Sequence, residues 1–248
     1  MSERFVAHTK ILPVTQQRLL PELATAPYMG LVLYGGTAVA LRLGHRQSVD
    51  FDFFTNEHLP PNKILRSAFP FLDRAVVLQD QPDTLTVSVS SSHEEPPVKV
   101  SFFGDIDYGR VGVPAIADST GLEVASLMDL MATKLKAMLQ CIEAKDYRDI
   151  AAMISAGVNL AEGLAAAKIL FGNAFQPTES LKTLVYFEGG DLDTLSIMDR
   201  QTPTAAAEGI RELPLAGLLS QRLSSCALRS EELNETDSPD DTPSSSIL

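Results

Sequence analysis

Two aspartates separated by one residue, Asp50 and Asp52, lie inside an apolar run and constrain this chain more than any other feature. The run is typical of a β-strand, and side chains two residues apart leave a strand on the same face. We therefore expect the two carboxylates to point together, with Val49, Phe51 and Phe53 directed the other way into a core. Because neighbouring carboxylates repel each other, a cation is expected between them, and a divalent metal is the usual one.

A double glycine, Gly35-Gly36, stands upstream of this strand. It follows the apolar run 31–34 and comes just before a helix-like segment at 37–43. Glycine lets a backbone approach a phosphate closely, and the N-terminus of a helix attracts one. A phosphate-binding turn and a pair of metal ligands, joined by one helix, predict metal-assisted phosphoryl chemistry on a nucleotide.

The order of apolar strand, double glycine, short helix and Asp-x-Asp strand resembles the polymerase-beta-like nucleotidyltransferase superfamily. The longer string, with Gly44-His45-Arg46, Ser48 and Asp50-Phe51-Asp52-Phe53-Phe54, is similar to the AbiEii/AbiGii-type toxin nucleotidyltransferases. The resemblance covers most of residues 30–190. It implies an α+β fold, in which a nucleotidyltransferase-like lobe with a short mixed sheet and flanking helices is followed by a helical lobe. It also implies an NTP substrate and Mg²⁺ or Mn²⁺ as the metal.

Two further strings are similar to motifs of that family. Lys134 lies in the run 129–135, and the resemblance implies that its ammonium group contacts the nucleotide phosphates. The string 145–150 is similar to the fourth motif, in which an aspartate near the helix start is implied to act in catalysis. We favour Asp146 for that role, with Asp149 second, and Lys145 adds positive charge near the phosphates.

Together these motifs give a set of candidate site residues. The expected metal ligands are Asp50 and Asp52. The expected catalytic residues are Asp50, Asp52, Lys134, Asp146 and Asp149. The expected nucleotide-binding residues are Gly35, Gly36, Thr37, Arg46, Ser48, Lys134 and Lys145.

A third acidic metal ligand is missing from the strand where many superfamily members carry one. The candidate strand spans residues 97–103, and Ser101 occupies the expected position, with Lys99 on the same face. A serine is a poor metal ligand beside a carboxylate. The number of metals, one or two, therefore stays open.

Each of these patterns also has a purely structural interpretation. Asp50 and Asp52 could form the exposed face of an edge strand, and Gly35-Gly36 could be a plain turn. Lys134 could extend to solvent from an apolar helix. Charges at 145–149 could simply stabilise a helix start. His45 could hydrogen-bond a phosphate or cap the short helix.

The net charge of −12 over 248 residues limits the kind of partner. Six acids and no basic residue lie at 231–248, and without them the rest of the chain carries −6. Proteins that bind a nucleic-acid backbone normally show a basic surface. The charge therefore opposes a large nucleic-acid footprint, although a small basic patch near the site is compatible with it.

The sequence also indicates a cellular location. Two cysteines, Cys141 and Cys226, make neither a disulfide framework nor a zinc site, which fits a reducing compartment. Residues 1–10 lack the apolar core of a signal peptide. Apolar stretches fall short of the ~20 residues of a membrane span. We expect a cytoplasmic protein without membrane contact.

The pattern of elements divides the chain into three parts. Residues 1–117 alternate helices and strands and are predicted to form the nucleotidyltransferase lobe. Helices are expected at 14–26 with a break at Pro21, and at 61–69, and strands at 31–34, 49–54, 75–78, 84–90 and 98–103. Residues 118–230 read as a helical lobe, with helices at 126–141, 145–154, 159–171, 178–187 and within 205–222. The acidic, Ser/Thr/Pro-rich segment 231–248 is predicted to be disordered.

These features favour transfer of a nucleoside monophosphate from an NTP to an acceptor, with release of pyrophosphate. The resemblance implies a toxin-like role in a toxin–antitoxin or phage-defence system, with RNA such as a tRNA end, or protein, as acceptor and a cognate antitoxin as partner. Two alternatives stay open. One is transfer to a small molecule, as in antibiotic-modifying nucleotidyltransferases, and the other is a catalytically degenerate protein that binds a nucleotide or a partner.

Overall fold

The computed structural model describes residues 3–90 and 95–226 of the chain. Within these residues one mixed sheet of eight strands is formed, in the order β1-β7-β8-β2-β3-β6-β5-β4. The sheet and its covering helices confirm the predicted α+β class. The strands are β1 (Glu3–Phe5), β2 (Val32–Tyr34), β3 (Asp50–Phe54), β4 (Val76–Gln81), β5 (Thr84–Val89), β6 (Val98–Phe103), β7 (Ala115–Ala117) and β8 (Glu123–Val124).

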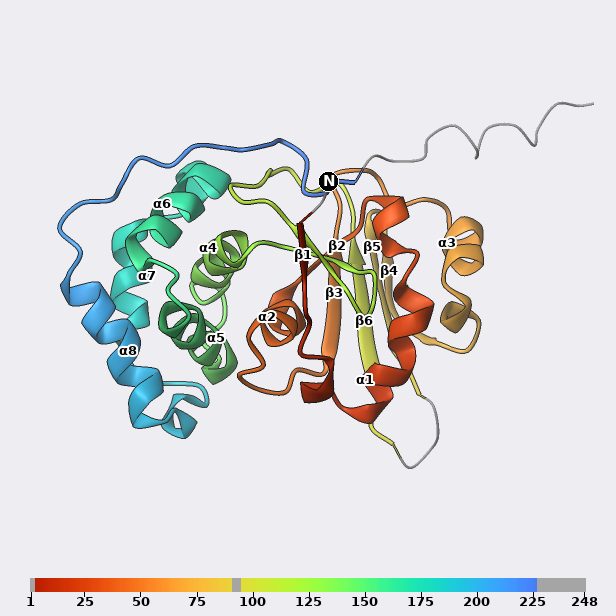
Figure 1. Ribbon diagram of the computed structural model, residues 1–248, viewed down its shortest axis with the longest axis horizontal. Coiled ribbons are helices and arrows are strands. Elements are labelled where there is room, and N and C mark those ends of the chain that lie inside the picture. Colours follow the sequence, from red (N-terminus) through yellow and green to blue (C-terminus); the bar gives the residue numbers. More distant parts are fainter. Residues whose placement is uncertain (1–2, 91–94, 227–248) are drawn as a thin grey trace, which may run out of the picture.

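The helices fall into two groups around the sheet (Figure 1). Helices α4 to α8 gather on one side, at the left of Figure 1, and α2 lies between them and the sheet, in contact with β3, α4 and α5. Helices α1 and α3 lie on the opposite side. The helices are α1 (Val14–Leu19), α2 (Gly35–Leu43), α3 (Asn62–Ala68), α4 (Leu127–Ala137), α5 (Ala144–Ser155), α6 (Leu160–Phe171), α7 (Pro177–Leu184) and α8 (Ile197–Glu208).

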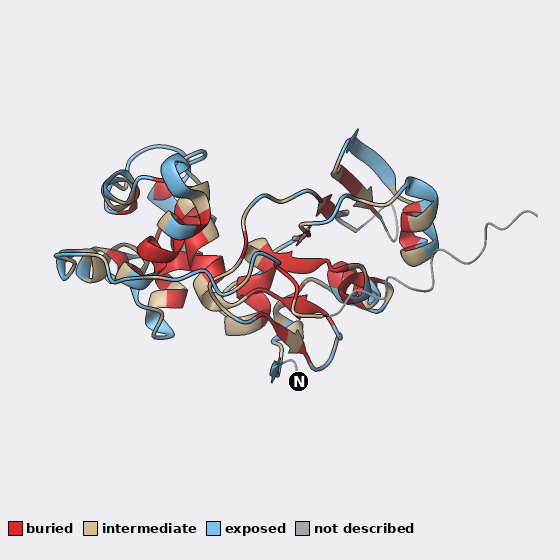
Figure 2. Cartoon of the chain, turned by 90° about the horizontal axis from the view of Figure 1, so that it is seen from above, coloured by how far each residue is buried: buried red, intermediate tan, exposed pale blue. Residues whose placement is uncertain are grey.

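Strand β3 lies in the interior of the sheet and supports the predicted metal pair. It pairs antiparallel with β2 and parallel with β6. Phe51 and Phe53 are fully buried, as their alternation predicts, and Figure 2 shows the core of the sheet as buried. The prediction that the Val49 side chain points into the core is wrong. Its side chain is 56% exposed because the strand begins only at Asp50 and Val49 belongs to the preceding loop.

Helix α2 begins at Gly35, two residues earlier than predicted, and it ends at Leu43, where Gly44 caps it in the left-handed conformation. Its inner face is apolar, and Ala38, Val39 and Leu41 are fully buried. The Thr37 hydroxyl donates a hydrogen bond to the backbone carbonyl of Asp50. This bond fixes the first turn of α2 against the start of β3.

Ser126 begins α4, as predicted, because its hydroxyl accepts a hydrogen bond from the backbone N–H of Asp129. Leu130, Met131 and Leu135 of this helix are fully buried. Lys134 lies between Met131 and Leu135 in the sequence, and its ammonium group contacts Asp146 and Asp149 of α5. The packing of α4 therefore directs a lysine toward the predicted site.

Near the N-terminus the predicted break at Pro21 is confirmed. Helix α1 ends at Leu19, and a 3₁₀ helix, Leu20–Leu23, continues the chain. Three short strands, β1, β7 and β8, were not predicted. Strand β8 at Glu123–Val124 lies in the sheet, pairing with β2 and β7, before the helices begin at Leu127.

The prediction of helical structure within 205–222 is mostly wrong. Helix α8 ends at Glu208, and residues 209–226 contain no helix. Instead this segment, blue in Figure 1, runs from α8 back to the sheet. There Ser220 bridges to Arg110, and the Ser224 and Ser225 hydroxyls donate hydrogen bonds to the buried Glu123 carboxylate.

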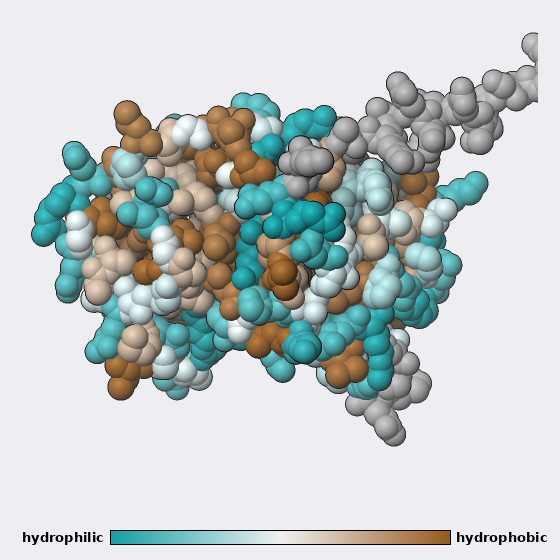
Figure 3. Space-filling view, in the orientation of Figure 1, coloured by the Kyte–Doolittle hydropathy of each residue, from teal (hydrophilic) through white to brown (hydrophobic). Residues whose placement is uncertain are grey.

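The face drawn in Figure 3 mixes hydrophobic and hydrophilic residues over both the helices and the sheet. Among the described residues, no helix combines the length and the apolar character needed to cross a membrane. The acidic segment 231–248 lies outside the described residues. The division of the chain into two lobes and a tail stays a prediction.

Candidate active site

A cavity of about 460 Å³ opens between the start of α2, one face of β3 and helices α4 and α5. Its size is within the range of small-molecule sites, roughly 300–1,000 Å³. Every predicted site residue lines it except Thr37 and Asp149. The structure thus brings together residues that the sequence spreads from Gly35 to Asp146.

Asp50 and Asp52 leave the same face of β3, as predicted, and both side chains line the cavity. Both side chains are partly buried. Because β3 is an interior strand of the sheet, the interpretation of Asp50 and Asp52 as the exposed face of an edge strand is wrong. Burial raises the pKa of Asp52, and the neighbouring Asp50 carboxylate raises it further, while Lys99 opposes both effects. A buried carboxylate beside another carboxylate is a group that gains from a nearby cation.

The neighbouring strand β6 supplies no acid at this point. In the register of the two strands Asp50 lies opposite Lys99, and Asp52 lies opposite Ser101. The Lys99 ammonium is 3.5 Å from an Asp50 carboxylate oxygen. A hydrogen bond from Ser101 favours the ionised form of Asp52.

This donor set fits a magnesium ion that is completed by a substrate. Magnesium is commonly held by one or two carboxylates together with phosphate oxygens and water. Asp50 and Asp52 supply those carboxylates on one side of the cavity. The Lys99 ammonium group balances part of their negative charge. Because Ser101 lies opposite Asp52 on β6, strands β3 and β6 together supply two carboxylates at this point.

The double glycine brings the start of α2 directly against Asp52. Gly35 has a φ of +72°, which a residue with a side chain rarely adopts, and a Cβ there would lie 2.6 Å from Asp52 Oδ2. At Gly36 a Cβ would lie 2.7 Å from Arg46 Nη2 and 3.0 Å from Ser48 Oγ. The turn is therefore built for close approach, and the positive end of the nine-residue helix α2 faces the cavity.

A Gly35→Ala substitution tests this close approach. We expect it to lower the free energy of unfolding by about 1–2 kcal/mol through left-handed strain. We also expect it to slow nucleotide chemistry by on the order of 10²-fold because it displaces Asp52. Chemical denaturation and a transfer assay measure the two effects.

Gly121→Ala is the matched control for this test. Gly121 has a φ of +73°, and a Cβ there would meet nothing within 4 Å. The control should share the loss of stability and keep full activity. Equal activity of the Gly35 and Gly121 variants would contradict the assigned contact with Asp52.

Lys134 lies at the centre of a buried charge network on the opposite wall. Its ammonium is 2.5 Å from Asp146 Oδ1 and 2.9 Å from Asp149 Oδ2. Arg46 binds Asp149 through two parallel hydrogen bonds of 2.6 and 2.8 Å, and His45 Nε2 is 2.8 Å from the same carboxylate. Lys134 is only 7% exposed, so the interpretation as a solvated surface lysine is wrong.

The contacts within this network shift the pKa values of Asp149 and Lys134 in favour of their ionised forms. Burial alone would raise the pKa of Asp149, but His45, Lys134 and Arg46 outweigh burial and hold that pKa well below its usual range. Burial alone would lower the pKa of Lys134, but Asp149 and Asp146 outweigh it and raise the pKa. Both side chains are therefore ionised at neutral pH.

Within this network Asp146 and Asp149 differ in whether they are accessible from the cavity. Asp146 is 4% exposed and lines the cavity, whereas Asp149 has no exposed surface and does not line it. The Asp149 carboxylate joins the loop after α2 to helices α4 and α5. Lys145 is exposed at the cavity, where its ammonium pairs with Glu143 at 3.0 Å.

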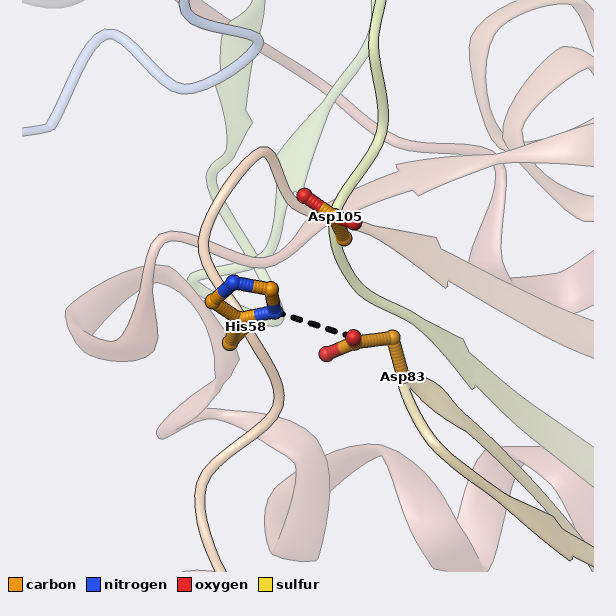
Figure 4. A group of neighbouring side chains, drawn as sticks. All are labelled: His58, Asp83 and Asp105. Carbon is orange, nitrogen blue, oxygen red and sulfur yellow. Dashed lines mark hydrogen bonds and ion pairs between the residues drawn. The ribbon is translucent and has the colours of Figure 1, made fainter.

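A second group of potential metal ligands lies elsewhere (Figure 4). His58, Asp83 and Asp105 offer ligand atoms within 4.8 Å of one another, and none of the three lines the cavity. Asp83 accepts hydrogen bonds from the backbone N–H of Leu59 at 2.8 Å and from His58 at 2.9 Å. It thus fastens the loop after β3 to the β4–β5 turn.

Three aromatic residues that line the cavity were not predicted: Phe54, Tyr108 and Phe171. Phe54 follows Asp50 and Asp52 at the same two-residue spacing, so the strand pattern could have identified it. Tyr108 lies in the connection after β6, and Phe171 ends α6. Their positions depend on the tertiary fold, and no local pattern in the sequence indicates them.

Known proteins share sequence and fold with this chain. Residues 18–216 match the sequence model of a family described as nucleotidyl transferase AbiEii toxin, Type IV TA system. An uncharacterized protein of Aquifex aeolicus (strain VF5) is 32% identical over 158 residues, which cover 63% of this chain and 73% of that protein. The crystal structure of a candidate nucleotidyltransferase from H. pylori aligns with a TM-score of 0.50 and 18% identity, covering 78% of this chain and 90% of that chain. The last likeness supports the fold alone.

Proposed function

The chain belongs to the AbiEii family of nucleotidyltransferase toxins, and from this premise we propose that it moves a nucleoside monophosphate from an NTP to a hydroxyl of an RNA, such as a tRNA end. One observation supports the proposal above others. The paired carboxylates of Asp50 and Asp52 and the N-terminus of α2 meet in one cavity with Lys134.

We assign the phosphates to the wall formed by α2 and α4. The backbone N–H groups of Gly35 and Gly36 at the helix start attract phosphate oxygens. Lys134 supplies a positive charge that its buried neighbours keep in place, and Arg46 and Ser48 lie beside Gly36. Lys145 adds charge at the edge of the cavity.

Asp50 and Asp52 would hold Mg²⁺ or Mn²⁺. Such an ion, when bound, would neutralise negative charge on the triphosphate and favour departure of pyrophosphate. Phosphoryl transfer requires positioning and charge stabilisation more than covalent participation of the protein. The two carboxylates and Lys134 fit that requirement from opposite sides of the cavity.

Asp146 is the candidate for the proton acceptor. The acceptor oxygen bonds to the α-phosphorus, the bond from that phosphorus to the β-phosphate oxygen breaks, and pyrophosphate leaves. The hydroxyl proton passes to the Asp146 carboxylate, which lines the cavity. Phosphates that share the Lys134 ammonium would weaken its 2.5 Å contact with Asp146 and make that carboxylate a better base.

The net charge of −12 argues for a small footprint on the acceptor. The basic residues that line the cavity, Arg46, Lys134, Lys136 and Lys145, suit the end of an RNA chain better than a long duplex. A toxin role, with a cognate antitoxin as partner, follows from the family by analogy. We further propose residues 1–117 and 118–230 as the two lobes on either side of this site, with β8 and residues 220–225 of the second segment returning to the sheet of the first lobe.

A labelling experiment tests the function. The protein is incubated with Mg²⁺ and each labelled NTP in turn, together with total cell RNA, a protein fraction or a small-molecule pool. Label is expected in the RNA fraction. Label in protein or in small molecules would instead identify those acceptors, and no label in any fraction, together with no NTP binding by calorimetry, would contradict the enzymatic proposal. Growth arrest on expression, lost in the variant that replaces Asp50 and Asp52, is the expected sign of a toxin.

A further inference from the structure

Three aromatic side chains line the cavity in addition to the charged groups of α2 and α4. Phe54, Tyr108 and Phe171 line it, and they come from the end of β3, the connection after β6 and the end of α6. The Tyr108 and Phe171 rings meet edge to face, with centroids 4.9 Å apart. Phe54 packs against Tyr34 at a centroid distance of 5.1 Å.

These rings are not simply part of the core. Large aromatic side chains in the core of this protein, such as Phe51, Phe53 and Phe102, are fully buried. Phe54, Tyr108 and Phe171 instead are only partly buried, and they contribute surface to the cavity. An aromatic surface held rigidly by other rings, yet accessible from a cavity, is suited to stacking on a flat ligand.

The spacing along β3 places this surface at a fixed distance from the metal ligands. Asp50, Asp52 and Phe54, which are two residues apart along the chain, lie on the same face of the strand. At about 3.3 Å per residue, the Phe54 backbone lies roughly 7 Å from that of Asp52 and roughly 13 Å from that of Asp50. A ligand with a polyphosphate at Asp50 and Asp52 would therefore extend its other end toward Phe54 and the Tyr108–Phe171 pair.

We propose that the base of the NTP stacks on the Tyr108 ring, with the Phe171 and Phe54 rings beside it, so that this aromatic wall is the base subsite of the cavity. The inference rests on the proposed function, because it needs the triphosphate at the α2 end. Stacking recognises the flat face that all bases share. The wall therefore contributes to affinity for every NTP.

A fluorescence experiment tests stacking directly. The chain contains no tryptophan, so Phe171→Trp introduces a single indole fluorophore at the proposed subsite. Titration with an NTP should quench its emission, whereas inorganic triphosphate should leave the emission nearly unchanged. Equal changes with both ligands, or NTP binding by calorimetry without any change in emission, would overturn the proposal.

Calorimetry on a second set of variants gives an independent test. Base–aromatic stacking predicts that Tyr108→Ala raises the NTP dissociation constant about 5- to 150-fold. Binding of inorganic triphosphate should stay as in the wild type. Tyr108→Phe keeps the ring and should restore NTP binding. Tyr28→Ala, which removes a tyrosine that is 64% exposed and outside the cavity, is the matched control and should change neither ligand.

The outcomes separate this inference from the function on which it rests. Wild-type protein that binds neither NTP nor triphosphate would contradict the proposed function and the stacking with it. Wild-type binding of NTP that Tyr108→Ala leaves unchanged would overturn stacking alone. A Tyr108→Ala variant that loses NTP and triphosphate binding to the same extent would also overturn it, because Tyr108 would then have a structural role.

Discussion

Replacing Asp50 and Asp52 together by asparagine is expected to reduce nucleotidyl transfer by on the order of 10³-fold or more, with the fold intact. Asparagine keeps the shape of each side chain and removes its charge. The two carboxylates on one face of β3 that we propose as metal ligands would then both be lost. The label-transfer assay measures the loss, and circular dichroism checks the fold.

The stability of this double variant should change little or improve. Burial raises the pKa of Asp52, which shows that the ionised form is costly where it lies. Removing the charge removes that cost, although Lys99 loses its partner at Asp50. An inactive variant that is at least as stable as the wild type is the pattern of a functional site rather than of a structural one.

Asp105→Asn provides the control for the metal assignment. Asp105 belongs to the group with His58 and Asp83, in which His58 and Asp105 are exposed, and this is the other set of potential ligands in residues 3–90 and 95–226 (Figure 4). This variant should keep its activity and its magnesium dependence. Loss of magnesium dependence in Asp105→Asn, with full activity in the Asp50 and Asp52 variant, would move the metal to the exposed group.

The second large effect concerns stability. Asp149→Ala is expected to lower the free energy of unfolding by about 3–5 kcal/mol, because it leaves buried positive charges without their counterion. The Asp149 carboxylate is fully buried and contacts Arg46, Lys134 and His45. Urea denaturation of the variant and the wild type measures the difference.

Asp118→Ala is a control that removes one arginine–carboxylate contact of the same kind at the surface. Asp118 Oδ1 accepts from Arg4 Nε at 2.6 Å, the same distance as the Arg46–Asp149 contact, but its side chain is 44% exposed. Surface ion pairs contribute about 0–1 kcal/mol, so this variant should lose far less stability. Similar losses in both variants would show that burial does not decide the strength of the Asp149 network.

The dependence on pH supplies a further readout of the same network. The pKa of folded Asp149 is held below its usual range, so the ionised carboxylate stabilises the fold at neutral pH. This contribution is complete above the pKa of the unfolded carboxyl, about 3.9, and is lost as the pH falls below it toward the folded pKa. The difference in stability between wild type and Asp149→Asn should be constant from pH 5 to 8 and shrink below about pH 4. A difference that instead shrinks between pH 8 and 6 would assign the effect to another group.

Local sequence patterns were sufficient to predict the part of the site that lies in α2 and β3. The alternation around Asp50 and Asp52 gave the correct face of β3, and the double glycine gave the start of α2 to within two residues. Both depend on backbone periodicity and on the freedom of glycine, which a sequence displays directly. The roles of the candidate residues stay predictions.

Other features depended on contacts between distant segments. Strands β1, β7 and β8 have only two or three residues each, too few for a period to show. Asp146 and Asp149 were nearly equivalent in sequence, and only the packing of α4 against α5 separates their access to the cavity. Helix α8 was misplaced although its start carries a capping box, Ser196 with Asp199, that marks it.

The segment after α8 has a consequence for motion around the cavity. Helices α4 to α8 are joined to the sheet once through residues 125–126, and again where residues 220–225 bond to Arg110 and Glu123. Between these two points the contacts of α2 with α4 and α5 and the buried Asp149 network also hold the helices against the sheet. Cutting the chain after Glu208 would remove the second connection alone, so the walls of the cavity are expected to keep their arrangement.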